Sequence, residues 1–93
     1  MKAIWNGKVI AESSETVVVE SNHYFPRSSI IGEYFTESSK TTHCPWKGDA
    51  NYFNIEVDGE SFPDGAWYYS EPKEAAQSIS NRVAFYSAVK VEE

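Results

Sequence analysis

The clearest structural pattern in the chain is the alternating stretch Tyr52-Phe53-Asn54-Ile55-Glu56-Val57. Successive side chains of an extended strand point to opposite faces, so Phe53 shares one face with the isoleucine and the valine that follow it. The pair Asp58-Gly59 directly after this stretch is typical of a tight turn. A second turn is predicted at Pro63-Asp64-Gly65, followed by a strand over Ala66-Trp67-Tyr68-Tyr69. The middle of the chain is therefore predicted to be an antiparallel pair of strands.

Shorter strands are predicted on both sides of this pair. Asn6-Gly7 accepts the positive φ angles of a type I′ turn and joins two apolar runs into a hairpin. β-Branched residues, and the extended backbone that precedes a proline, favour further strands. The predicted strands outside the central pair cover residues 3–5, 8–11, 16–20, 23–26, 33–37 and 82–91, the last with a break near Ser87. A polar connection is expected at residues 38–40.

One short helix is predicted over residues 72–81. Pro72 suits its first position, acidic residues lie in its first turn, and Asn81 ends it. A single helical turn is expected at residues 28–31. These elements predict a mainly β fold: a small antiparallel β-barrel or sandwich with one short helix, in which residues 1–93 form a single domain. The absence of repeated strand–helix units argues against a parallel doubly wound sheet.

Composition and charge narrow the class of partner. The formal net charge of −6 repels the phosphate backbone of nucleic acids, so no nucleic-acid partner is expected. The chain breaks at Asn6-Gly7 before a signal-peptide run can form, and no apolar stretch approaches ~18 residues, so no membrane partner is expected. The lone Cys44 cannot form an internal disulfide, which favours a cytoplasmic location. The oligomeric state is left open.

The stretch from Thr42 to Tyr52 has the highest concentration of reactive and aromatic side chains in the chain. The thiol of Cys44, the imidazole of His43, the ammonium of Lys47 and two aromatic rings fall within these eleven residues, around a proline and a glycine. Such a gathering of polar and aromatic side chains at one turn indicates a candidate site.

The motif Cys44-Pro45-Trp46-Lys47-Gly48 belongs to a wider pattern along the chain. Its other members are Ala50, Tyr52, Tyr24-Phe25-Pro26, Trp67-Tyr68-Tyr69, Glu71-Pro72 and Val83-Ala84-Phe85-Tyr86. With this pattern the chain resembles the bacterial family catalogued as domain of unknown function 427. The resemblance covers nearly the whole chain and implies a small β-rich fold similar to the Mss4-like barrels. It carries a nucleotidyltransferase-like family label and implies no established activity.

The leading hypothesis is a module that binds a small molecule, either anionic or flat, in a cleft at the Cys44–Gly48 turn. The predicted ligand-binding residues are Lys47, Arg27, Tyr52, Tyr69 and Trp67. The two cations would supply charge, the two tyrosines walls and hydroxyl groups, and Trp67 a stacking surface. The commoner roles of such residues stay open: a solvated lysine, a surface ion pair, and rings that simply fill the core.

Two other classes of function stay open. The first is an enzyme, either thiol-dependent through Cys44 or nucleotidyltransferase-like. Against thiol catalysis, Cys44 lacks an evident base. Against nucleotidyl transfer, the chain has neither an Asp-x-Asp pair nor a glycine-rich phosphate loop. The second is a protein-interaction module with an exposed aromatic patch. No metal or other cofactor is predicted, because a single cysteine departs from the paired cysteines that hold zinc in Mss4-like barrels.

Overall fold

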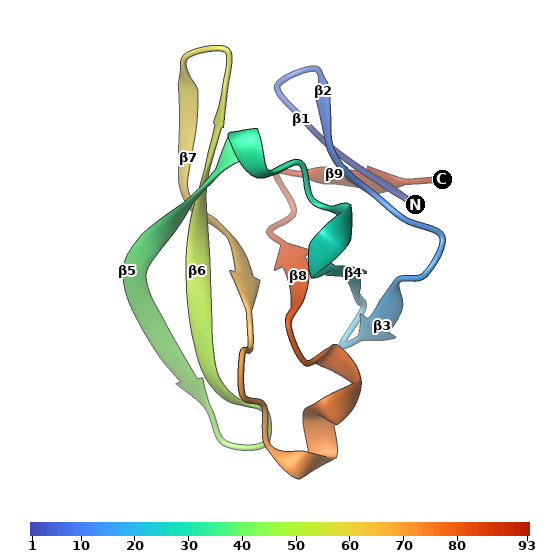
Figure 1. Ribbon diagram of the computed structural model, residues 1–93, viewed down its shortest axis with the longest axis vertical. Helices are drawn as coiled ribbons and strands as arrows, with labels where there is room; N and C mark the ends of the chain where they lie inside the picture. Colours follow the sequence, from blue (N-terminus) through green and yellow to red (C-terminus); the bar gives the residue numbers. More distant parts are fainter.

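The computed structural model describes all 93 residues and contains nine strands in two antiparallel sheets (Figure 1). The strands are β1 (Lys2–Trp5), β2 (Lys8–Glu12), β3 (Val17–Val19), β4 (Asn22–Pro26), β5 (Phe35–Cys44), β6 (Gly48–Val57), β7 (Glu60–Tyr68), β8 (Arg82–Phe85) and β9 (Lys90–Glu92). One sheet has the order β2-β1-β9 and the other β3-β4-β8-β7-β6-β5. Neither sheet closes on itself, so the mainly β fold is sandwich-like and not a closed barrel.

The main core lies between the two sheets. Phe53, Ile55 and Val57 of β6 are almost fully buried, which confirms the alternation predicted for this strand. Ala3 of β1 and Ile10 of β2 pack into the same cluster from the three-stranded sheet. Because burial of one large apolar side chain stabilises a fold by about 1.5–3 kcal/mol, this cluster holds the two sheets together.

The opposite face of the six-stranded sheet carries a second cluster, which we call the tyrosine-rich face. Its buried members are Tyr24, Ala50, Tyr52, Tyr69, Ala76, Ile79 and Ala84. Adjacent residues of a strand face opposite sides, so Tyr68 joins the main core whereas Tyr69 joins the tyrosine-rich face. The helical segment η3 (Glu74–Ile79) contributes Ala76 and Ile79 to this face.

Two predicted connections are strand residues in the structure, so these two predictions are wrong. Residues 38–40 lie inside β5, where the register against β6 is irregular. Pro63-Asp64-Gly65 lies inside β7 at a second irregularity, where Asp64 has a left-handed φ of 56°. A β-bulge uses the same polar and left-handed residues as a turn, but the strand continues beyond it. The sequence pattern of a bulge therefore resembles that of a turn.

The predicted helix is a short 3₁₀ segment, η3, whose backbone leaves helical geometry at Ala76 (φ −120°). Both of its flanks are tied to other elements. The N–H of Lys73 donates to the carbonyl of Lys47 at 2.9 Å, and the N–H of Asn81 donates to the carbonyl of Tyr69 at 2.9 Å. Six residues held between two fixed ends are too short to form a stable α-helix.

Two further 3₁₀ turns, η1 (Arg27–Ser29) and η2 (Gly32–Tyr34), connect β4 to β5. The first of them overlaps the single helical turn predicted for residues 28–31. The break predicted near Ser87 is confirmed, because it separates β8 from β9. No helical segment has the length and apolar character needed to cross a membrane.

Gly65 tests how closely the main core packs at the β7 bulge. A Cβ atom added there would lie 2.8 Å from the Phe62 ring and 2.9 Å from Cδ1 of Ile55. We therefore expect Gly65→Ala to lower the free energy of unfolding by about 1–3 kcal/mol, measured by urea denaturation. Gly32→Ala is the matched control, because a Cβ there meets nothing within 4 Å, and it should stay within about 0.5 kcal/mol of wild type. Equal stability of the two variants would contradict this packing.

Candidate functional site

The hairpin between β5 and β6 is the Cys44–Gly48 motif, and it anchors the segment that follows β7. Gly48 has a φ of +108°, a conformation that favours glycine. A Cβ at this position would also lie 3.5 Å from the backbone nitrogen of Lys73. The N–H of Lys73 donates to the carbonyl of Lys47, and its Nζ donates to the carbonyl of Pro45 at 2.7 Å. The motif therefore has a structural role that its sequence alone does not reveal.

The Lys47 side chain is buried, although lysine is among the residue types that are least often buried. The residue is only 8% exposed, and its ammonium pairs with the carboxylate of Glu20. Nζ lies 5.5 Å from the ring centroids of both Trp46 and Tyr69, within the range of cation–π attraction. An unpaired ammonium would be costly to bury, so Glu20 and the two rings allow Lys47 to occupy this position.

Glu20 reaches Lys47 from the turn between β3 and β4. Glu20 and Ser21 both have left-handed φ angles, 53° and 66°, in a two-residue hairpin turn closed by Val19 and Asn22. The strands β3 and β5 are the two edge strands of the six-stranded sheet. The ion pair therefore links a turn at one edge of the sheet to a hairpin at the other, across the tyrosine-rich face.

The environment keeps both members of this ion pair charged. Burial alone would lower the pKa of Lys47, but the hydrogen bond to Glu20 and the nearby Tyr24 and Tyr69 outweigh burial and raise the pKa above the usual lysine value. The hydrogen bond and the charge of Lys47 lower the pKa of Glu20 below its usual value. The pair is therefore ionised at neutral pH.

Hydrogen bonds also join other residues of the tyrosine-rich face. The indole Nε1 of Trp67 donates to the hydroxyl of Tyr24 at 3.1 Å, and the hydroxyls of Tyr52 and Thr42 lie 2.9 Å apart. Burial raises the pKa of Tyr69, so that side chain stays protonated at neutral pH. The tyrosine-rich face therefore holds two separate hydrogen-bonded pairs in addition to the ion pair of Lys47.

The structure brings four of the five predicted ligand-binding residues to the tyrosine-rich face and separates the fifth. The four are Lys47, Tyr52, Tyr69 and Trp67. Arg27 lies on the opposite face, where its guanidinium is 4.8 Å from the ring centroid of Phe53 and 5.2 Å from that of Tyr68. Both rings belong to the main core. Lys47 and Arg27 therefore do not share a site.

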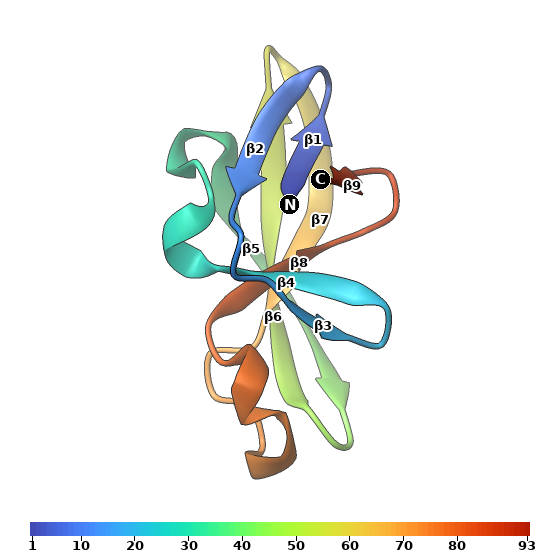
Figure 2. The ribbon, with the colours of Figure 1, turned by 90° about the vertical axis from the view of Figure 1, so that its right-hand side faces the viewer.

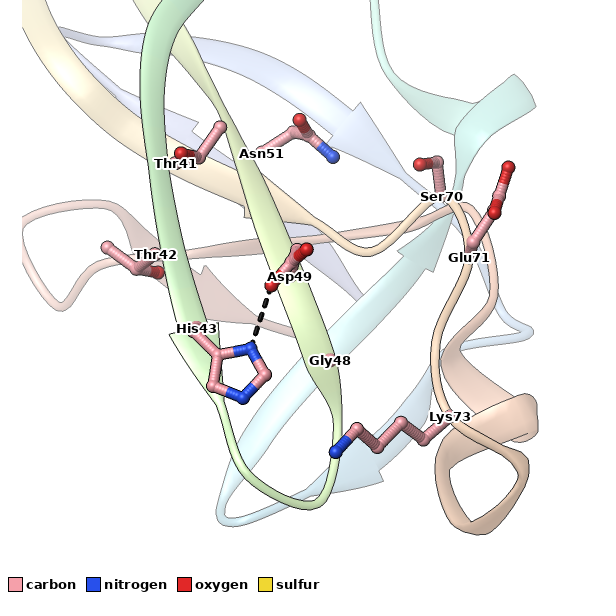
Figure 3. A pocket seen from close by; sticks show the side chains of 9 residues that line it. All are labelled: Thr41, Thr42, His43, Gly48, Asp49, Asn51, Ser70, Glu71 and Lys73. Carbon is pink, nitrogen blue, oxygen red and sulfur yellow. Dashed lines mark hydrogen bonds and ion pairs between the residues drawn. The ribbon is translucent and has the colours of Figure 1, made fainter.

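An open hollow of about 680 Å³ borders the Cys44–Gly48 hairpin; we call it the polar hollow. It is lined by Thr41, Thr42, His43, Gly48, Asp49, Asn51, Ser70, Glu71 and Lys73, none of them hydrophobic. Figure 3 shows β5 and β6 on one side and the segment after β7 on the other, with the side chains of Asn51 and Ser70 pointing toward each other. Across the strand pair Thr41 is opposite Asn51 and His43 is opposite Asp49, so these four residues share one sheet face.

His43 has a defined orientation in the wall of the polar hollow. Its Nδ1 lies 2.8 Å from Oδ1 of Asp49 (Figure 3). An ionised carboxylate only accepts hydrogen bonds, so Nδ1 carries the proton and Nε2 of the neutral ring is an acceptor. Both side chains are exposed, and an exposed pair of this kind contributes only about 0–1 kcal/mol of stability. The main consequence of the pair is therefore the orientation of the imidazole ring.

The polar hollow lies at the turn where the sequence predicted a cleft, but its lining side chains differ from the predicted set. Asn51 and Ser70 belong to no sequence motif. Their side chains face each other only because of the way β6 and the end of β7 align. The one available signal was strand alternation, which puts Asn51 on the face opposite Tyr52. Cys44 is half-buried, packs against the tyrosine-rich cluster and does not line the hollow. No group of three or more His, Cys, Asp or Glu side chains is arranged to hold a metal ion.

Comparison with known families agrees with the resemblance seen in the sequence. The family model described as domain of unknown function (DUF427) matches residues 1–93. The chain belongs to the DUF427 family. No curated protein matches this DUF427 chain. The family description names no activity, so the function of this DUF427 protein has to be inferred from its sites.

Removal of the charge of Glu20 is expected to destabilise this DUF427 protein more than removal of the charge of Lys47. Glu20→Gln leaves a buried ammonium without a counter-charge, whereas Lys47→Met leaves a carboxylate that is half exposed to water. We expect a lower urea midpoint for Glu20→Gln, and a stability within about 1 kcal/mol of wild type for Lys47→Met. Glu92→Gln is the control, because it breaks an exposed pair with Lys90 and should leave the midpoint unchanged. Equal midpoints for Glu20→Gln and Glu92→Gln would contradict the role of Glu20 as the counter-charge of the buried ammonium.

The stability difference between wild type and Glu20→Gln should also depend on pH. The pKa of Glu20 is lowered on folding. Its contribution to the free energy of unfolding is therefore present above the ordinary carboxyl pKa of 4.5 and is lost as the pH falls through the pKa in the folded protein. The pKa of Lys47 is raised on folding. Its contribution to the free energy of unfolding is therefore present below the ordinary lysine pKa of 10.5 and is lost as the pH rises through the pKa in the folded protein. Urea denaturation should show a constant difference around neutral pH that shrinks on acidification. A difference that grew on acidification would contradict these shifts.

Proposed function

We propose that this DUF427 protein binds a small polar molecule, uncharged or positively charged, in the polar hollow beside the Cys44–Gly48 hairpin. The observation that carries the proposal is the lining, which offers hydrogen-bond donors and acceptors around about 680 Å³. Ligand sites commonly measure roughly 300–1,000 Å³. No lining residue is hydrophobic, so hydrogen bonds hold the ligand in place and its surface carries several hydroxyl or amino groups.

The charges around the polar hollow oppose an anionic ligand. Asp49 and Glu71 contribute two carboxylates against the single ammonium of Lys73. The whole chain carries a net charge of −6, which adds to the repulsion of anions. The expectation of an anionic ligand rested on Lys47 and Arg27, and neither residue lines this hollow.

Three lining residues are placed to recognise hydroxyl and amino groups. In the neutral imidazole of His43, Nε2 is an acceptor whose direction Asp49 holds. The Asn51 amide supplies both a donor and an acceptor, and the facing Ser70 hydroxyl supplies either (Figure 3). A ligand that bridges these groups contacts both β6 and the segment after β7.

The cellular setting belongs to the same proposal. The lone Cys44 favours a reducing cytoplasm, and the resemblance implies a bacterial protein with a Mss4-like fold. The acidic net charge disfavours a nucleic-acid partner, and no membrane partner is inferred. A polar metabolite of the cytoplasm is the ligand class that fits this setting.

Three related sugars test the ligand class. Glucosamine, glucose and glucuronate share a hydroxylated ring and differ in charge. When each is titrated into ¹⁵N-labelled protein, we expect saturable amide shifts around Thr41, Asp49, Asn51 and Ser70, with affinity falling in the order glucosamine, glucose, glucuronate. Asn51→Ala should weaken glucosamine binding about tenfold, because the hydrogen bonds of the amide to the ligand are lost.

The control for this experiment is Thr36→Ala, an exposed position on β5 outside the polar hollow, which should bind as wild type does. Tightest binding by glucuronate would contradict the inferred charge preference. Shifts confined to the tyrosine-rich face, or no saturable shift with any of the sugars, would contradict the proposed site.

A further inference from the structure

A second, smaller hollow lies between the β3–β4 turn and the connection from β8 to β9. We call it the ring hollow; its volume is about 210 Å³. It is lined by Ser21, Asn22, His23, Phe85, Tyr86, Ser87, Val89 and Val91. Figure 2 shows the β8–β9 connection extending outward on the same side of the molecule as the β3–β4 turn. The hollow therefore lies where the two sheets meet.

The lining of the ring hollow differs in character from that of the polar hollow. Half of its residues are hydrophobic, and none is an aspartate, glutamate, lysine or arginine. Partial burial and the nearby Tyr52 hydroxyl raise the pKa of Tyr86 to about 12, so this phenol stays uncharged at neutral pH. Small-molecule sites commonly combine apolar walls with a few placed polar groups, and this hollow contains both kinds of residue.

Hydrogen bonds and ring contacts hold the β8–β9 wall of the ring hollow in place. The N–H of Tyr86 donates to the carbonyl of Gly65 at 3.2 Å, and the N–H of Val89 donates to the carbonyl of Tyr86 at 2.9 Å. The rings of Tyr86 and Trp67 lie 4.7 Å apart. This wall is therefore formed before any ligand arrives.

The β3–β4 wall is held in a comparable way. Nδ1 of His23 lies 2.9 Å from Oγ1 of Thr16, which fixes the imidazole and leaves Nε2 without a partner in the protein. Ser21 directly follows Glu20, whose carboxylate is bound to the buried Lys47. The ion pair across the tyrosine-rich face therefore also positions one wall of the ring hollow.

We propose that the ring hollow binds a free, uncharged aromatic ring that carries one hydroxyl or N–H group, such as a simple phenol. An engineered apolar cavity of about 150 Å³ holds one benzene molecule, so about 210 Å³ suits a single substituted ring. Phe85, Val89 and Val91 supply apolar contact, while His23 and Asn22 supply partners for the polar group. A carboxylate would find no counter-charge there. This site is independent of the polar hollow and of its proposed ligand.

Four probes test the ring hollow by amide NMR titration. p-Cresol should give saturable shifts at residues 21–23 and 85–89. Toluene should bind more weakly because it lacks the hydroxyl, and benzoate about tenfold more weakly or worse because its charge is unpaired. N-acetyltyrosinamide carries the same phenol on a peptide backbone that the hollow cannot hold, so it should also bind about tenfold more weakly than p-cresol.

Two adjacent, exposed positions provide a matched pair of variants. Ser87 lines the ring hollow and Ala88 does not. Ser87→Phe should fill the hollow and weaken p-cresol binding at least about tenfold, while Ala88→Phe should change it less than about twofold. Benzoate binding as tightly as p-cresol, or equal effects of the two variants, would overturn the proposal. N-acetyltyrosinamide binding more tightly than p-cresol would overturn the assignment to a free ring.

Discussion

The ion pair between Lys47 and Glu20 ties the two edges of the six-stranded sheet to each other. It joins the turn after one edge strand to the hairpin after the other, and its Lys47 end is buried against aromatic rings. Three positions of the Cys44–Gly48 motif have a physical reason at this junction. Lys47 supplies the charge, Trp46 a ring beside it, and Gly48 the left-handed backbone that lets the segment after β7 approach. The motif that looked like a ligand site therefore has a demonstrable structural role.

Both hollows border elements that this ion pair holds. The polar hollow lies beside the hairpin that carries Lys47, and the ring hollow lies beside the turn that carries Glu20. The two hollows differ in chemistry. No hydrophobic residue lines the first, whereas half of the residues that line the second are hydrophobic and none carries a carboxylate, ammonium or guanidinium group. We infer two ligand classes for this reason: a molecule rich in hydroxyl or amino groups in the first, and a single uncharged ring in the second.

Local patterns predicted most of the strands, whereas the sites depended on contacts that no local pattern contains. The alternation around Phe53 and the turn pair Asp58-Gly59 are signals within a few residues, and both are present in the structure. The bulge at Asp64 looked like a turn because both use a left-handed residue. Lys47 meets a partner 27 residues away in sequence, and Arg27 faces the other side of the sheet, so neither placement followed from spacing.

Amide hydrogen exchange of the Glu20→Gln variant tests the role of the ion pair most directly. The N–H of Lys73 donates to the carbonyl of Lys47, so it reports on the junction itself. We predict that this amide and those of the β3–β4 hairpin lose protection in the variant, while the amides of β6 in the main core keep theirs. Unchanged protection at Lys73 would contradict the view that the ion pair of Lys47 and Glu20 holds the two edges of the sheet together.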